Sequence, residues 1–188
     1  LHPFIQTKPE VMHTYLAAAL PVCTLGETPP LSLHEFYVQC SGILSREELH
    51  DLDLFLHNRF FEGRTHFGQA WTALNIQMEN EMAALRAQKW QVHPPLPRLH
   101  SSFSLEASRL VHEAFNRETP LQMEWTLDQG RWGLAEGLIS PDHPLGLERI
   151  LAFGIQLQLM HRWAAMDADT GREQLNTLLE DRVNRILV

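Results

Sequence analysis

The chain has 188 residues, a formal net charge of −8 and 44% hydrophobic residues, as expected for one folded domain or two small ones that share a core. The acidic balance argues against a protein that binds nucleic acid through its phosphates, because such binding needs clustered Lys and Arg. No stretch predicts a signal peptide or direct membrane insertion. Cys23 and Cys40 lack metal-type spacing, so we expect free, buried thiols.

Pairs of residues typical of helix caps mark the expected helix starts in the first half of the chain. A Ser or Thr followed three residues later by Glu is typical of a helix start, because each side chain caps a backbone N–H of the other residue. Such pairs are Thr7 with Glu10, Ser32 with Glu35, and Ser45 with Glu48. After Thr65, apolar residues recur at steps of three and four from Phe67 to Leu85, which predicts an amphipathic helix of about 25 residues.

A proline-rich stretch follows that long helix. His93-Pro94-Pro95-Leu96-Pro97 cannot be helical, because proline lacks the N–H and restricts the residue before it. We therefore interpret 1–188 as a single helical domain, or as two helical halves, 1–92 and 104–188, joined by a linker at 93–103.

The second half restarts near Ser104, and Thr119-Pro120-Leu121-Gln122 is a strong helix start with Pro at the first helical position. Glycines then fall on one helical face, at Gly130, Gly133 and Gly137. They indicate either a fraying helix end or a groove where another helix approaches closely.

The stretch from Leu145 to Met166 carries two adjacent apolar rows, which is typical of a helix covered on several sides. We expect it to be the central core helix, followed by an amphipathic helix over 170–186. No segment shows the period-2 alternation of a strand. The predicted fold class is all-α, with about seven or eight helices packed as an irregular bundle.

No motif for phosphate binding, nucleophilic catalysis or a zinc helix occurs, and no cofactor is expected. His50, Asp53 and His57 share one helical face and are the only metal-site candidates, although the same spacing arises on the solvent face of any amphipathic helix. We interpret the five tryptophans as core anchors rather than as a stacking platform.

Several short motifs, taken in order, resemble a poorly characterised bacterial family whose genes accompany V/A-type ATPase operons and which is related to the C subunit of that enzyme. The first-half motifs are 15–21, 29–36 and 44–45. The second half carries two motifs. The middle motif comprises Asn116, Pro120-Leu121, Glu124, Leu127-Asp128 and Arg131-Trp132, and the C-terminal motif comprises 150–152, 157–158, His161-Arg162-Trp163 and 171–173.

The resemblance implies part of the helical fold of the C subunit and no catalytic residues. It implies a non-catalytic subunit or accessory factor that couples the central shaft of the rotary ATPase to its membrane ring, in proton or sodium transport. Its partners would be those ATPase subunits, and its location would be cytoplasmic, peripheral on the inner face of the cytoplasmic membrane.

Two other hypotheses remain open. One is a metal-dependent helical enzyme that uses His50, Asp53 and His57. The other is a generic helical adaptor for protein–protein interaction, which would dock through the glycine face or an exposed apolar patch.

Overall fold

The computed structural model describes residues 9–59 and 62–166, which form seven helices and no strand. The all-α prediction is therefore confirmed for this part of the chain. Thr7 and the helix expected over 170–186 lie outside the described residues. The helices are α1 (Pro9–Ala19), α2 (Leu33–Ser41), α3 (Arg46–Leu56), α4 (His66–Trp90), α5 (Leu105–Phe115), α6 (Pro120–Gly137) and α7 (Leu147–Ala164).

The caps predicted from local sequence are present. Three complete capping boxes begin α2, α3 and α6, formed by Ser32 with Glu35, Ser45 with Glu48, and Thr119 with Gln122. Thr65 and Ser104 cap α4 and α5 through their hydroxyl oxygens. Each cap satisfies a backbone N–H that the helix itself cannot pair, so these starts are encoded by neighbouring residues alone.

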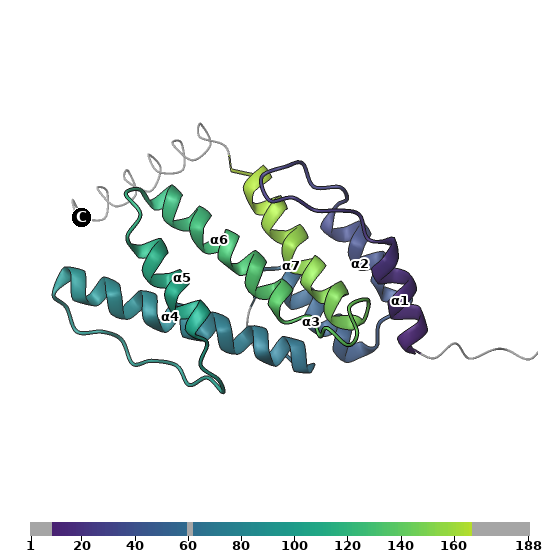
Figure 1. Cartoon of the computed structure of the whole chain (residues 1–188), viewed down its shortest axis with the longest axis horizontal. Helices are drawn as coiled ribbons and strands as arrows, with labels where there is room; N and C mark the ends of the chain where they lie inside the picture. The colour runs from purple at the N-terminus through teal and green to yellow at the C-terminus, as the bar shows by residue number, and fades with distance from the viewer. Residues whose placement is uncertain (1–8, 60–61, 167–188) are drawn as a thin grey trace, which may run out of the picture.

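Helix α7 is the centre of the core, as its sequence predicted. It lies between α6 on one side and α1, α2 and α3 on the other (Figure 1). Ten of its 18 residues are buried, among them Leu157 and Phe153. The Phe153 ring meets the Phe36 ring edge-on at 4.9 Å. A Cβ on Gly154 would lie 2.6 Å from Leu52, so this glycine permits the close approach of α3.

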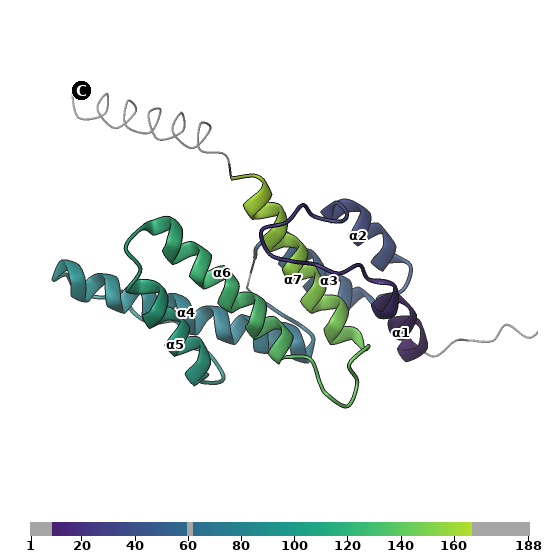
Figure 2. The same ribbon diagram turned by 45° about the horizontal axis from the view of Figure 1, so that its top comes forward.

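Helices α4, α5 and α6 lie on the side of α7 that is away from α1 and α2 (Figure 1). Helix α4 packs against α5 and α5 packs against α6, so the three lie side by side (Figures 1 and 2). At Gly130 a Cβ would lie 2.2 Å from Leu110 of α5, whereas Gly133 and Gly137 have no atom within 4 Å of that position. Of the predicted glycine face, only Gly130 therefore lies where a neighbouring helix approaches closely.

Residues 92–104, which we call the proline strap, connect α4 to α5 and run back beside α4 (Figure 1). Two amide side chains of α4 hold the strap. Asn80 exchanges two hydrogen bonds, of 2.7 and 2.9 Å, with the backbone of Arg98. Gln77 exchanges two of 2.8 Å with the backbone of Ser104. The elements before and after the strap contribute side chains to the same buried core.

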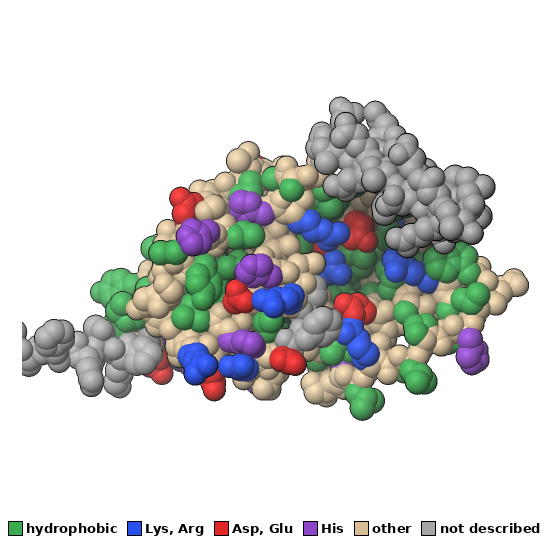
Figure 3. Space-filling model, turned by 180° about the vertical axis from the view of Figure 1, so that it is seen from behind, with side chains coloured by type: hydrophobic (Ala, Val, Ile, Leu, Met, Phe, Trp, Pro, Cys, Tyr) green, Lys and Arg blue, Asp and Glu red, His purple; other side chains and the backbone are tan. Residues whose placement is uncertain are grey.

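The strap exposes apolar side chains that lack cover from the described residues. Leu96 and Leu99 are 95% and 96% exposed, and hydrophobic side chains stand out along the lower right edge of the molecule in Figure 3.

Trp90, at the end of α4, is 65% exposed. The interpretation of the tryptophans as core anchors is confirmed for Trp71, which is fully buried, and for Trp132, which packs against the core. It was wrong at Trp90, because the end of α4 extends beyond the helices that cover its middle. No helix among residues 9–59 and 62–166 is long and apolar enough to cross a membrane.

Candidate functional site

Of the predicted metal candidates, His50 and Asp53 lie on α3 and His57 is the residue that ends it, and the three do not form one site. His57 Nδ1 lies 3.2 Å from Asp53 Oδ1, and Arg59 pairs with the same carboxylate at 2.7 Å. His50 Nε2 is buried without a hydrogen bond, while Asp53 and His57 reach solvent. Within residues 9–59 and 62–166, no three His, Cys, Asp or Glu side chains are arranged to hold a metal ion.

The two cysteines are free. Cys40 is fully buried, and burial raises the pKa of its thiol to about 12. Cys23 is half-buried, and burial raises its pKa to about 11 against a smaller, opposing effect of Arg149. A thiol must ionise to act as a nucleophile, so neither cysteine is poised for catalysis at neutral pH.

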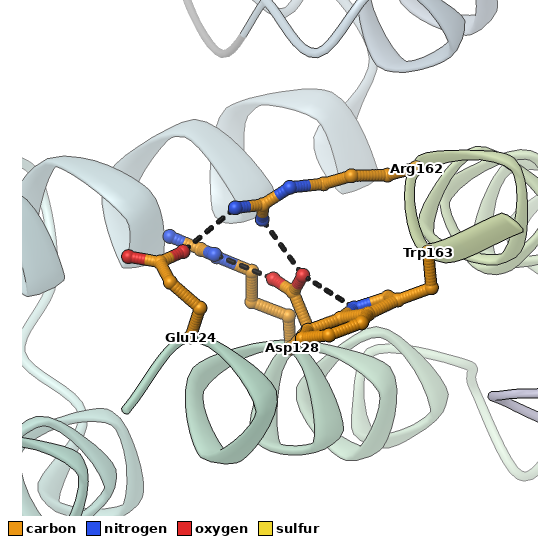
Figure 4. Close-up of polar contacts among 5 residues, drawn as sticks. Glu124, Asp128, Arg162 and Trp163 are labelled. Carbon is orange, nitrogen blue, oxygen red and sulfur yellow. Dashed lines mark hydrogen bonds and ion pairs between the residues drawn. The ribbon is translucent and has the colours of Figure 1, made fainter. Parts of the chain in front are cut away.

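A buried carboxylate joins α6 to α7. Asp128 is fully buried, and Figure 4 shows three side chains directed at it. Arg131 donates to Oδ1 at 2.7 Å, while Arg162 and the indole Nε1 of Trp163 donate to Oδ2 at 2.7 and 3.0 Å. Two guanidinium groups thus offset the charge of one buried carboxylate, which removes most of the cost of burying it.

A second carboxylate extends this cluster toward solvent. Glu124 accepts a hydrogen bond of 2.7 Å from the other terminal nitrogen of Arg162, so one guanidinium bridges two carboxylates on α6 (Figure 4). Glu124, Asp128 and Arg131 lie four and three residues apart, which places them on one face of α6. We call these three residues, together with Arg162 and Trp163, the Asp128 network.

Aromatic packing fixes the α7 side of the Asp128 network. The Trp163 ring meets the Trp125 ring edge-on, with 4.7 Å between centroids. The Trp125 ring in turn covers Gly26, whose φ of +92° is one that glycine adopts without strain. His161 Nε2 lies 2.9 Å from the carbonyl oxygen of Leu31, which ties the loop between α1 and α2 to the end of α7.

A cavity of about 790 Å³ opens beside the Asp128 network, and we call it the α6 groove. Trp125 and Trp163 contribute aromatic surface to it, and Leu121 contributes an exposed apolar side chain. Its other lining residues are Asn116, Arg117, Glu118, Gln122, Thr126 and Gln129. Arg117 pairs with Glu113 and donates to Thr126. A pocket of this size with aromatic and a few polar groups is of the kind that binds a ligand or a partner side chain.

The Asp128 network and the α6 groove both contain residues from the second-half motifs of the resemblance. Glu124, Asp128 and Arg131 come from the middle motif, and Arg162 and Trp163 come from the C-terminal one. Sequence alone did not predict that these residues meet, because 34 positions separate Asp128 from Arg162. A signal was nevertheless present: Asp128 lies three residues after Trp125 and four before Trp132, on one face of the predicted helix, and a carboxylate on such an apolar face is costly to bury unless a cation meets it.

Comparison with known proteins assigns no activity to this site. Residues 102–185 match the family model DUF2764, whose description is a protein of unknown function. The match covers less than half of the 188-residue chain and includes α5, α6 and α7, so the Asp128 network and all the lining residues of the α6 groove lie within it. No curated protein and no solved structure matches the chain.

Proposed function

We propose that this protein is a non-catalytic subunit or accessory factor of a V/A-type rotary ATPase, similar to its C subunit, which docks on the central shaft or membrane ring. The observation that carries the proposal is the Asp128 network. Residues from the two second-half motifs of the resemblance meet in one cluster, and every carboxylate there is paired with arginine.

The chemistry of the Asp128 network favours a mechanical role over a catalytic one. A general acid or base needs a proton that substrate can reach, whereas Asp128 is buried and accepts from three fixed donors. Such a cluster holds α6 and α7 at a set angle. A component that transmits force between a shaft and a ring needs helices whose mutual orientation does not change.

The α6 groove is the docking surface we assign to this function. Leu121 is 62% exposed at its edge, and Trp125 and Trp163 form its aromatic side. Apolar and aromatic groups at the centre of a concave surface are typical of sites where partners bind tightly. In the rotary ATPase, the occupant would be a side chain from the shaft or the ring.

The first test is an affinity pull-down of the tagged protein from detergent-solubilised membranes of its own host, read by mass spectrometry. We expect stalk and ring subunits of the V/A-type ATPase. Leu121→Asp should reduce their recovery about tenfold, since a charge enters an apolar contact worth about 1.4 kcal/mol. The matched control is Leu96→Asp, the same change at an exposed leucine of the proline strap, outside the groove.

Recovery of the tagged protein alone, with ATPase present in the input, would refute the proposed function. Equal recovery by Leu121→Asp and Leu96→Asp would leave the ATPase as the partner and move the docking surface away from the α6 groove.

A generic helical adaptor is the second candidate, and the same groove favours it. Its distinguishing result is a partner that is captured by the wild type, lost with Leu121→Asp, and unrelated to the rotary ATPase.

A further inference from the structure

A second cavity, of about 770 Å³, lies where α7 begins, and we call it the α7 N-terminal cavity. Its walls come from α1, from the first residues of α3 and α4, and from the loop that leads into α7. Glu148 lines this cavity and Trp163 lines the α6 groove. Fifteen residues of one helix separate them, so the two sites are about 22 Å apart along α7.

Four carboxylates line the α7 N-terminal cavity, and no described lining residue is Lys or Arg. Glu48 and Glu148 are half-buried and each accepts a backbone N–H, from Ser45 and Ser140. Glu10 and Asp142 are exposed at the rim, and their carboxylates pair with no described side chain. His13, His66 and His143 also line the cavity, and when these imidazoles are neutral the four carboxylates make the field inside it negative, which favours a cationic group.

His13 is a second, independent observation that indicates a ligand in this cavity. The residue is only 7% exposed and lines the cavity, and its ring nitrogen Nε2 has no hydrogen bond. Glu48 Oε2 lies 3.5 Å from this nitrogen. A buried ring nitrogen without a hydrogen bond costs free energy that an incoming N–H donor would recover. When Nδ1 carries the proton, Nε2 can accept that donor.

Apolar side chains form part of the wall. Phe67 is buried, and Val11, Leu145 and Leu147 also line the cavity. Carboxylates beside apolar side chains suit a ligand side chain with an aliphatic stem and a charged end, which is the chemistry of arginine and lysine.

We propose that the α7 N-terminal cavity binds a basic, amphipathic peptide segment of a partner protein, in which arginine or lysine is flanked by apolar residues. The cation pairs with Glu10 and Asp142 and donates toward His13 and Glu48, while its neighbours cover Phe67 and Val11. This inference goes beyond the proposed function and does not depend on it, since it concerns the opposite end of α7.

Other ligand chemistries fit this cavity less well. Anions, including nucleic-acid phosphates, would meet four carboxylates without a Lys or Arg among the described lining residues. A divalent metal needs ligands already close together, and the described residues offer no such group.

The test uses the full-length protein and a capped hexapeptide of alternating arginine and leucine, titrated by calorimetry at low ionic strength. We expect saturable binding that weakens as salt is added. Glu10→Gln with Asp142→Asn should weaken binding about tenfold, because two carboxylates that face the cation are removed. Glu27→Gln with Glu106→Gln removes the same charge from exposed residues that do not line the cavity, and should leave affinity unchanged.

Two further ligands test separately the need for a cation and the need for apolar residues beside it. The same peptide with citrulline in place of arginine should bind at least about tenfold more weakly, since the cation is lost while shape is kept. Spermidine supplies charge without apolar neighbours and should also bind more weakly. In nuclear magnetic resonance spectra, the imidazole nitrogens of His13 should shift when the arginine peptide is added.

Equal affinity of the two double variants, or no saturable binding by the wild type, would overturn the proposal. Spermidine binding as tight as the peptide would overturn the choice of a peptide as ligand. Circular dichroism of both double variants establishes that they are folded before these comparisons are made.

Discussion

Two aspartates, Asp51 on α3 and Asp128 on α6, are fully buried, and the protein satisfies them in different ways. Among the described residues, Asp51 accepts hydrogen bonds from neutral donors only: the backbone N–H groups of Arg64 and Thr65, at 2.8 Å each, and the Thr65 hydroxyl at 2.6 Å. Asp128 accepts from two guanidinium groups and an indole. One carboxylate is held by a turn of backbone, and the other by charged side chains.

The difference follows from what each carboxylate connects. Asp51 reaches residues 13 and 14 positions away and fixes the start of α4 next to α3. Its approach depends on Gly68, where a Cβ would lie 2.0 Å from Oδ2. Asp128 reaches 34 and 35 positions along the chain, to a different helix. A local turn can present N–H groups to a carboxylate, whereas two helices facing each other can offer only side chains.

The largest effect is expected for Asp128→Ala. It leaves two guanidinium groups close together without their carboxylate, and breaking a buried ion pair typically costs about 3–5 kcal/mol. Because Arg131 and Arg162 are 17% and 28% exposed, water offsets part of the loss. We expect about 3 kcal/mol less free energy of unfolding in urea.

Asp142→Ala is the matched control, because Asp142 is exposed; it should change the free energy of unfolding by less than about 0.5 kcal/mol. A loss below about 1 kcal/mol for Asp128→Ala would mean that the Asp128 network does not hold α6 against α7.

A somewhat smaller loss, about 2 kcal/mol in the same urea titration, is expected for Asp51→Ala. Three donors lose their acceptor, but all three are neutral, and the exposed Arg64 backbone can turn to water. The loss should be insensitive to salt, whereas that of Asp128→Ala should shrink as salt is added. If both losses respond equally to salt, the contrast between neutral and charged partners fails.

The smallest effect is expected for Trp163→Phe, which keeps an aromatic ring against Trp125 and removes only the indole N–H that donates to Asp128. One hydrogen bond of 3.0 Å to a charged, buried acceptor should contribute about 1.5 kcal/mol net, measured by thermal unfolding. Loss of as much stability as in Asp128→Ala would show that Trp163 acts through packing rather than through its N–H.

The two carboxylates also show how much could be predicted from sequence. Caps such as Ser45 with Glu48 depend on residues three positions apart, and these predictions were confirmed. The apolar rows of α7 likewise predicted its burial, because helical periodicity is local information. The partners of Asp128 and the histidines of the α7 N-terminal cavity depend on which helices meet, and that is decided by packing across the whole chain.

The metal hypothesis also shows that local sequence does not determine tertiary contacts. His50, Asp53 and His57 have suitable spacing on one helix, but spacing does not determine which side chains turn inward. His50 Nε2 is buried while Asp53 pairs with Arg59 at the surface. Sequence spacing therefore predicted a shared face, whereas in the structure Asp53 and His57 contact each other near solvent and the His50 Nε2 atom is buried.

The proline strap has a practical consequence for experiments on this protein. Gln77 and Asn80 fasten it at Ser104 and Arg98, while residues 93–97 before those points are exposed. An epitope or fluorophore attachment point inserted there would lengthen a surface connection without touching either fastening, and doubling a loop costs only about 0.6 kcal/mol. The strap thus offers a place to attach a reporter at a distance from both the α6 groove and the α7 N-terminal cavity, neither of which it lines.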